Sequence, residues 1–335
     1  MKLFTRIKLL FIILYATGAS AQDMHFTQFY SSPLYLNPAF AGADVCSRVS
    51  LTYRNQWPGI KKTYTSYLAS VDHYFNQKNI GAGILFASDV AGTGNLKTTI
   101  VNAQIAYEAR LTKKVYLRLG AQPGVQIRSI NFNNLIFGDQ IARGGEVASL
   151  EEPTLTRAFF DIGAGALVYT RRYWAGFSAY HLNRPNQSMR EDPDGLLPIK
   201  ISIHGGGKFQ VKSKEDEKDE AKKKYVSPAF NYRHQNKFDQ LDLGFYYSQS
   251  VLNLGLWYRG IPLFKAYSPG YKNNDAVAII VGLKTDRFNF GYSYDITISK
   301  LARLSYGAHE VAVSYQLCKL KKKKKYRMLT PCPKF

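Results

Sequence analysis

The sequence predicts an all-β protein, a transmembrane antiparallel β-barrel of about fourteen strands with an N-terminal plug segment. The whole chain holds 24 Tyr, 20 Phe and 26 Gly, and beyond residue 21 it has no apolar stretch long enough for a helical span. This composition suits strands with aromatic girdles and tight turns. Apolar and polar residues alternate through most of the chain, and the predicted strands follow one another without a break that would indicate a second domain.

Residues 1–21 have the features of a signal peptide. Three cations precede the apolar run 9–16, and Ala19-Ser20-Ala21 supplies the small residues that a signal peptidase reads. The run is shorter than the roughly 20 apolar residues of a membrane helix. No Cys follows the cleavage site, so we expect an exported protein that begins at Gln22 and carries no lipid anchor there.

Residues 22–47 form the predicted plug. Aromatic rings and prolines are dense here, and the apolar residues sustain a period of neither two nor 3.6. A segment this aromatic needs a place to be buried, and the strands that follow have room to enclose it. We expect these side chains to pack in the lumen: Phe26, Phe29, Tyr30, Tyr35, Asn37, Pro38 and Phe40.

The barrel is predicted over residues 48–318. From Val101 to Leu111, every second residue is apolar, while the intervening positions include Asn102, Gln104 and Glu108. A soluble β-sandwich also alternates, so the number and length of the strands favour the barrel. We expect carboxylates to pair with arginines across the lumen, in a structural rather than a catalytic role. The candidate lumen charges are Glu108, Arg110, Arg118, Arg128 and Asp161.

The connections between the predicted strands indicate the orientation. An even strand number places both ends of the barrel domain on one side, and outer-membrane barrels have short turns on the periplasmic side. The short connections fall near 76–79, 112–114, 171–172, 249–250 and 285–287. The charged insert 213–224 is an exception at the same end, and its nearly balanced charges favour a flexible turn over a docking site.

The C-terminal residues 319–335 form a basic tail that we expect in the periplasm. The formal net charge of the chain is +21, and the tail contains no acidic residue. An acidic periplasmic partner or anionic lipid head groups would suit it, and so would plain solvation. Nucleic acid is excluded by the exported location. The candidate partner contacts are Lys321, Lys322, Lys323, Lys324 and Lys325.

The cysteines also fall at the periplasmic rim. The periplasm is oxidising, and three thiols cannot all pair. The candidates are Cys46, Cys318 and Cys332, and we expect Cys332 to pair with one of the other two, which would attach the tail to the barrel seam.

Motifs for catalysis are missing from the sequence. The six histidines are scattered singly, without an HExxH pair, and no Gly-x-Ser-x-Gly occurs. Gly92-Thr93-Gly94 lacks the third glycine of a dinucleotide loop, and Gly205-Gly206-Gly207-Lys208 lacks the spacing of a phosphate loop. We therefore expect a protein that is not an enzyme and uses no cofactor or metal.

The run Asn37-Pro38-Ala39-Phe40-Ala41-Gly42, followed by Tyr53-Arg54-Asn55-Gln56-Trp57-Pro58, resembles the start of the PorP/SprF family. This resemblance implies an outer-membrane barrel of the type IX secretion system of Bacteroidetes, in several cases serving gliding motility. It implies binding to the C-terminal signal domain of secreted cargo, such as adhesins, and contact with the periplasmic machinery. The outward connections 131–156, 183–199 and 259–275 would then meet cargo.

Two other functions suit a barrel with an N-terminal plug. The chain is similar in this respect to outer-membrane transporters of hydrophobic small molecules, such as fatty acids, and a porin is a further possibility. A transporter of that kind needs an apolar lumen, whereas the predicted lumen faces are polar and charged. The lumen chemistry therefore favours secretion over transport.

Overall fold

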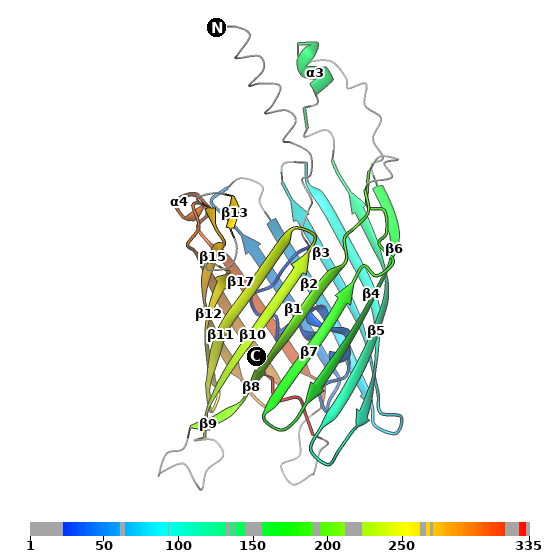
Figure 1. Ribbon diagram of the computed structural model, residues 1–335, viewed down its shortest axis with the longest axis vertical. Helices are drawn as coiled ribbons and strands as arrows, with labels where there is room; N and C mark the ends of the chain where they lie inside the picture. The colour runs from blue at the N-terminus through cyan, green and yellow to red at the C-terminus, as the bar shows by residue number, and fades with distance from the viewer. Residues whose placement is uncertain are drawn as a thin grey trace.

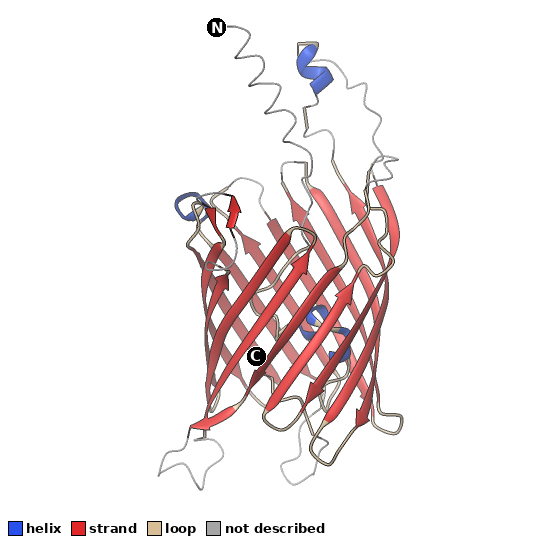
Figure 2. Cartoon of the chain, in the orientation of Figure 1, coloured by secondary structure: helices blue, strands red, loops and turns tan. Residues whose placement is uncertain are grey.

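The computed structural model describes residues 23–60, 64–92, 94–131, 135–136, 138–144, 156–189, 195–211, 223–261, 266–268, 271–318 and 328–332. Within these ranges the protein is a tall barrel of tilted strands (Figure 1), and Figure 2 shows short helical turns inside it. The predicted signal peptide, most of the charged insert and the run from Lys321 to Lys325 lie outside the described residues.

The wall consists of β1 (Arg48–Gln56), β2 (Tyr64–Phe75), β3 (Ile80–Ala91), β4 (Leu96–Arg110), β5 (Tyr116–Ser129), β6 (Thr156–Tyr169), β7 (Tyr173–Tyr180), β8 (Lys200–Gly207), β9 (Phe209–Val211), β10 (Lys224–Gln235), β11 (Phe238–Gln249), β12 (Leu252–Gly260), β15 (Asn274–Lys284), β16 (Phe288–Thr297) and β17 (Ala308–Gln316). The remaining elements are β13 (Ala266–Ser268), β14 (Tyr271–Lys272), α2 (Pro33–Leu36), η1 (Pro38–Phe40), α3 (Gly138–Ala142) and α4 (Ala302–Ser305). Among the helices that the structure describes, none has the length and apolar character needed to cross a membrane.

The barrel closes where its first and last strands pair. β1 and β17 are antiparallel, from Arg48 opposite Gln316 to Gln56 opposite Ala308. In the described part of the chain the hydrogen-bonded sheet has 15 strands, and β9 continues β8 along the same edge of β10. Fourteen strands therefore surround the lumen, and the predicted fold class is confirmed.

The two faces of the wall differ in chemistry. Along each strand, successive side chains point alternately to the lumen and to the outside. On β3, for example, Ile84 is 56% exposed while its neighbour Leu85 is completely buried. Large apolar side chains are exposed on the outer face of nearly every wall strand, whereas buried Ser, Asn, Gln, Arg and carboxylate side chains face inward. A soluble sandwich would bury its apolar face, so this exposed band indicates a lipid-facing surface.

The short connections identify the periplasmic end of the barrel. Residues 76–79, 111–115, 170–172, 250–251 and 285–287 join consecutive strands at the end where β1 begins and β17 finishes. Short turns are characteristic of the periplasmic side. We call the opposite end, which carries the longer connections, the outward end; it is at the top of Figure 1.

Candidate functional site

The structure places residues 23–47, which we call the plug, inside the barrel (Figure 2). The plug starts near the outward end, where Asp23 contacts Lys200 of β8, and leads to β1 at the periplasmic end. All seven predicted lumen-packing residues are within it. Tyr35 is partly buried. The other six are buried, namely Phe26, Phe29, Tyr30, Asn37, Pro38 and Phe40.

Asn37 sets the turn between α2 and η1 and attaches it to the wall. Its Oδ1 accepts a hydrogen bond from the backbone N–H of Ala39 at 2.9 Å, which caps η1. Pro38 occupies the first position of η1, where a missing N–H costs nothing. The Asn37 Nδ2 donates to the carbonyl oxygens of Ala166 on β6 and Phe177 on β7, each at 3.0 Å.

Glycines on the lumen face leave room for the plug backbone. A Cβ on Gly81 of β3 would lie 2.6 Å from the carbonyl carbon of Ala41, and one on Gly120 of β5 would lie 2.7 Å from the Cα of Ala39. Gly165 of β6 lies against the same turn, beside the Asn37 side chain. Since these neighbours are mostly backbone atoms, a larger residue in this row would displace the plug.

Carboxylates of the wall hold the outward half of the plug. Glu310 on β17 accepts hydrogen bonds from the backbone N–H groups of Thr27 at 2.7 Å and Gln28 at 2.8 Å. Arg54 on β1 bridges Glu310 at 3.0 Å and Asp295 at 2.8 Å. The buried charges are thus compensated both by one another and by the plug backbone.

Arg118 holds the periplasmic half in the same way. It is completely buried on β5 and pairs with Glu108 of β4 at 2.5 Å. It also donates hydrogen bonds to the carbonyl oxygens of Ala39, at 2.8 Å, and Ala41. These two predicted lumen charges therefore lie together and support the plug.

The other three predicted lumen charges have different positions. Asp161 pairs with His181 at 2.9 Å, so the expected arginine partner is wrong; His181 comes from the 181–199 connection. Arg128 lies towards the outward end, where its Nη1 donates to Gln187 at 2.5 Å. Arg110, the last residue of β4, is exposed at the periplasmic end, where its guanidinium lies 6.0 Å from the ring of Tyr116.

The disulfide joins Cys46 to Cys318, with a Cα–Cα distance of 5.4 Å. The expected pairing of Cys332 with either of them is therefore wrong. The strand register explains the observed pair: Arg48 of β1 lies opposite Gln316 of β17, and continuing this antiparallel register by two residues places Cys46 opposite Cys318. Cys332 is instead buried in the aromatic core of the lumen.

That aromatic core closes the lumen towards the periplasm. Phe29 packs edge-on against Trp257 of β12 with ring centroids 4.9 Å apart, and the Nε1 of Trp174 on β7 donates to the hydroxyl of Tyr30 at 2.9 Å. The described tail residues 328–332 contribute Met and Cys side chains to the same cluster. The plug is thus covered on its periplasmic side by part of the C-terminal tail.

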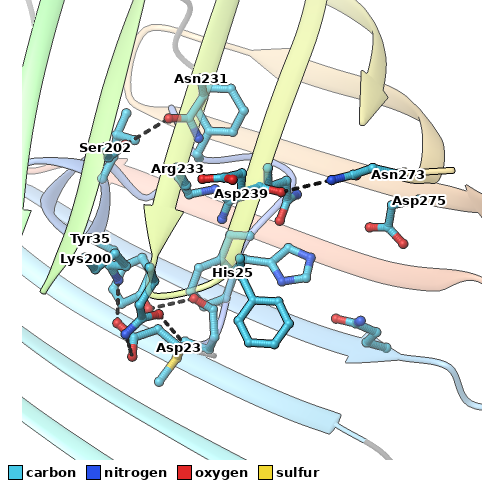
Figure 3. Close-up of a pocket in the computed structure, with 18 of the residues that line it drawn as sticks. Asp23, His25, Tyr35, Lys200, Ser202, Asn231, Arg233, Asp239, Asn273 and Asp275 are labelled. Atoms are coloured by element: carbon cyan, nitrogen blue, oxygen red, sulfur yellow. Dashed lines mark hydrogen bonds and ion pairs between the residues drawn. The ribbon is translucent and has the colours of Figure 1, made fainter. Parts of the chain in front are cut away.

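On its outward side the plug is the floor of a cavity of about 740 Å³ (Figure 3). Phe26, Phe29 and Tyr35 provide apolar floor surface, and the walls come from β8, β10, β11 and the connections after β12 and β16. Cavities of 300–1,000 Å³ commonly bind small molecules. The polar lining residues labelled in Figure 3 include Asp23, His25, Lys200, Ser202, Asn231, Arg233, Asp239, Asn273 and Asp275.

An ion-pair network fixes the start of the plug beside this cavity. Asp23 contacts the Nζ of Lys200 at 2.7 Å and the Nε2 of His181 at 2.8 Å. Burial alone would raise the pKa of Asp23, but these two cations hold it well below its usual value. Burial alone would lower the pKa of His181, but the carboxylates of Asp23 and Asp161 raise it to about 9. His181 is therefore an imidazolium that donates to two carboxylates at neutral pH.

Two more polar groups border the cavity. Burial and the guanidinium groups of Arg54 and Arg259 lower the pKa of His25 well below its usual value, so its imidazole is neutral and its Nε2 lies 3.3 Å from each arginine. The Asn231 side chain accepts from Ser202 through its Oδ1 at 3.0 Å. Its buried Nδ2 has no hydrogen-bond partner among the described residues.

The arrangement is suited to recognition. Across the described ranges, no cluster of three or more His, Cys, Asp or Glu residues is placed to hold a metal ion. The cavity instead combines an apolar floor with charges of both signs and a buried amide N–H group. Such a site can bury an apolar group while hydrogen-bonding to a polar one.

Several important residues were not among the predicted sites. Glu310 and Asp295 fall on the polar face of their strands, so the alternation alone could have indicated them as lumen charges. Lys200 and His181 carried no such signal, because each lies at the boundary between a strand and a connection. Their roles depend on where Asp23 lies in three dimensions.

The fold and the lumen define a class: an outer-membrane β-barrel that is filled by its own N-terminal segment. The family described as type IX secretion system membrane protein PorP/SprF matches residues 18–315, so the chain belongs to this family. The resemblance of the N-terminal motif is thereby confirmed, and the outer membrane is the location of the protein.

Solved structures with a similar fold are distant in sequence. They include the Pseudomonas putida toluene transporter TodX, with 11% identity and a TM-score of 0.48, where the match covers 90% of this chain and 96% of TodX. The KdgM porin has 8% identity and a TM-score of 0.35, over 81% of this chain and 99% of the porin. A comparison with curated proteins finds no match. At these identities the likeness concerns the barrel fold alone.

Proposed function

We propose that this protein is a non-enzymatic docking component of type IX secretion. It binds a segment of the C-terminal signal domain of secreted proteins in the outward cavity, and so helps to place cargo such as gliding adhesins on the cell surface. From its periplasmic end it contacts the secretion machinery. Family membership supports the secretion role.

The observation that carries the proposal is a filled lumen beneath a cavity that faces outward. The plug backbone is bonded to Glu310 and Arg118, and Asn37 joins it to two further strands. These contacts leave the plug as part of the interior rather than a loose gate. Cargo would therefore be bound at the outward end and would not pass through this barrel.

The lining of the cavity favours a peptide over a hydrocarbon. A peptide brings apolar side chains for the aromatic floor and carbonyl oxygens for donors such as the Asn231 Nδ2. A purely apolar ligand would leave the Asn231 Nδ2 without a hydrogen-bond partner, and a buried polar group left unpaired costs about 1–3 kcal/mol. The apolar floor is the feature that would favour a hydrophobic small molecule instead.

The test compares two buried asparagines of the lumen. Asn231→Leu removes the free amide at the cavity with little change in volume, whereas Asn102→Leu makes the same change away from it. With purified full-length protein and the purified C-terminal domain of a secreted adhesin, we expect Asn231→Leu to weaken binding about tenfold, since one lost hydrogen bond is worth about 1.4 kcal/mol. Asn102→Leu should bind like the wild type.

Other results would contradict the proposal. If both variants bind the cargo domain equally well, the cargo contact lies outside the cavity. Saturable binding of a fatty acid or toluene by the wild type, displaced by neither cargo domain nor peptide, would support the transport function instead.

A further inference from the structure

Exposed cations are concentrated on the periplasmic turns. Among the described residues 76–79, 110–115, 170–172 and 284–287, one side chain is acidic, Asp286. The exposed cations of the same turns are Lys78, Arg110, Lys113, Lys114, Arg171, Arg172, Lys284 and Arg287. The outward end differs, since cations such as Lys237 and Lys300 lie there together with carboxylates such as Asp239 of β11 and Asp275 of β15.

Five of these cations form a continuous group that we call the periplasmic arc: Lys78, Lys113, Lys114, Arg171 and Arg172. They lie on the β2–β3, β4–β5 and β6–β7 turns, and these six strands are neighbours in the sheet. Adjacent strands are about 4.8 Å apart, so neighbouring turns are roughly 10 Å apart. This is about one Debye length at 0.1 M salt, and the fields of the three turns therefore add.

The arc cations are available to a partner. Lys78, Lys113, Lys114, Arg171 and Arg172 form no salt bridge within the part of the chain that the structure describes. Five like charges on one rim repel one another, so this arrangement costs stability unless something offsets it. An acidic surface bound to the arc would offset this repulsion.

The position of the arc cations on the barrel favours a protein partner over lipid. At the periplasmic rim, the lipid-facing positions next to these turns are apolar or aromatic: Phe75, Leu111 and Tyr173 are each about half exposed. The cations occupy the turns themselves, beyond the ends of the strands. Head groups surround the side of a barrel, whereas residues at the tips of its turns face the aqueous periplasm along the barrel axis.

We propose that the periplasmic arc docks an acidic surface of a periplasmic protein. The inference rests on the proposed function in one respect, that this partner belongs to the secretion machinery. The interaction surface itself follows from the charge of the turns. It places the machine contact on the folded barrel, at the opposite end from the cargo cavity, in addition to the tail.

The test uses full-length protein in nanodiscs of zwitterionic lipid and labelled poly-L-glutamate as the acidic probe. The arc variant carries Lys113→Gln, Lys114→Gln, Arg171→Gln and Arg172→Gln. The matched control removes four exposed outward cations instead: Lys97→Gln, Arg143→Gln, Arg184→Gln and Lys237→Gln. Because all eight side chains are exposed, both variants should fold, which a heat-modifiability gel checks.

We expect the arc variant to bind the probe about thirtyfold more weakly than the wild type, and the control to bind within a factor of about three. Binding by the wild type should fall steeply with added salt. A crosslinker placed at Lys113 in cells should give a discrete protein adduct that the other three arc substitutions abolish. One placed at Lys237 should not give that adduct.

Three outcomes would overturn the inference. The first is an equal loss of probe binding in both variants, and the second is no loss of probe binding in either variant. The third is unchanged probe binding together with loss of co-purified anionic phospholipid from the arc variant, which would assign the arc to lipid. Binding of the cargo domain, measured on the same preparations, separates the two proposals. If the wild type binds poly-L-glutamate through the arc but binds no cargo domain, the proposed function fails and the docking surface stands.

Discussion

Gly120→Val tests whether the plug is an integral part of the barrel interior. Gly120 lies on the lumen face of β5, where a Cβ would be 2.5 Å from the carbonyl carbon of Pro38 and 2.7 Å from the Cα of Ala39. Ordinary van der Waals contact is 3.4–4 Å. The plug must therefore move back by about 1 Å, because the obstructing atoms are backbone and β5 is held by ladders on both sides.

The cost follows from what such a shift breaks. Overpacking costs about 1–3 kcal/mol. Arg118 holds the carbonyl oxygens of Ala39 and Ala41, and losing two hydrogen bonds from a charged donor adds about 3–6 kcal/mol. The sum, about 4–9 kcal/mol, is comparable to the stability of a whole domain. Since the ladders of the wall are untouched, we expect the plug to leave its site while the barrel stays folded.

Single-channel recording in planar lipid bilayers measures this outcome. The wild type should be closed, deletion of residues 23–42 should give the fully open conductance, and Gly120→Val should give openings of intermediate or full size. Ala121→Val is the matched control, because the neighbouring side chain points to lipid. A closed Gly120→Val channel with wild-type thermal stability would refute the reasoning, and so would equal leakage from Ala121→Val.

Two further predictions concern the ends of the plug. Cys46→Ser should remove about 2–5 kcal/mol of stability, because the bridge spans 272 residues, and so lower the unfolding temperature in heat-modifiability gels. Cys332→Ala should lower it less, and unreduced wild-type protein should label at one thiol once it is denatured, because Cys332 is buried and takes no part in the disulfide. The imidazolium of His181 stabilises the Asp23 contact fully below its unfolded pKa of about 6.5 and loses this contribution as the pH rises towards about 9. Channel openings should therefore increase between pH 6.5 and 9, and a His181→Gln variant should not show that increase.

The strands were predictable because one-sided burial gives a direct signal in the sequence. The alternating run that begins at Val101 lies on β4, where Asn102, Gln104 and Glu108 are buried and Val101, Ile105 and Tyr107 are exposed. In lipid, each outward position must be apolar while the lumen tolerates polar groups, so the period of two persists over long segments. Arg110 shows the limit of this signal: alternation places it on the lumen face with Glu108, but as the last residue of β4 it is exposed instead of being buried against the plug.

Side-chain partners were less predictable, because they depend on register and on the path of the plug. The Cys46–Cys318 bridge follows only once the β1–β17 register is known. Asp161 finds His181 rather than an arginine because a connection, and not a neighbouring strand, supplies its partner. Neither the register at barrel closure nor the course of a connection leaves a local pattern in the sequence.

The lumen charges bear on function in a way that composition alone does not reveal. Charged residues inside a barrel often line a water-filled path, but Glu310 and Arg118 are bonded to the amide and carbonyl groups of the plug. The interior therefore already binds one peptide through its backbone. The cavity above it has similar chemistry, since Asn231 and aromatic plug side chains line it together. On the proposed function, a cargo segment laid over the plug would meet donors and apolar surface of the kind that hold the plug.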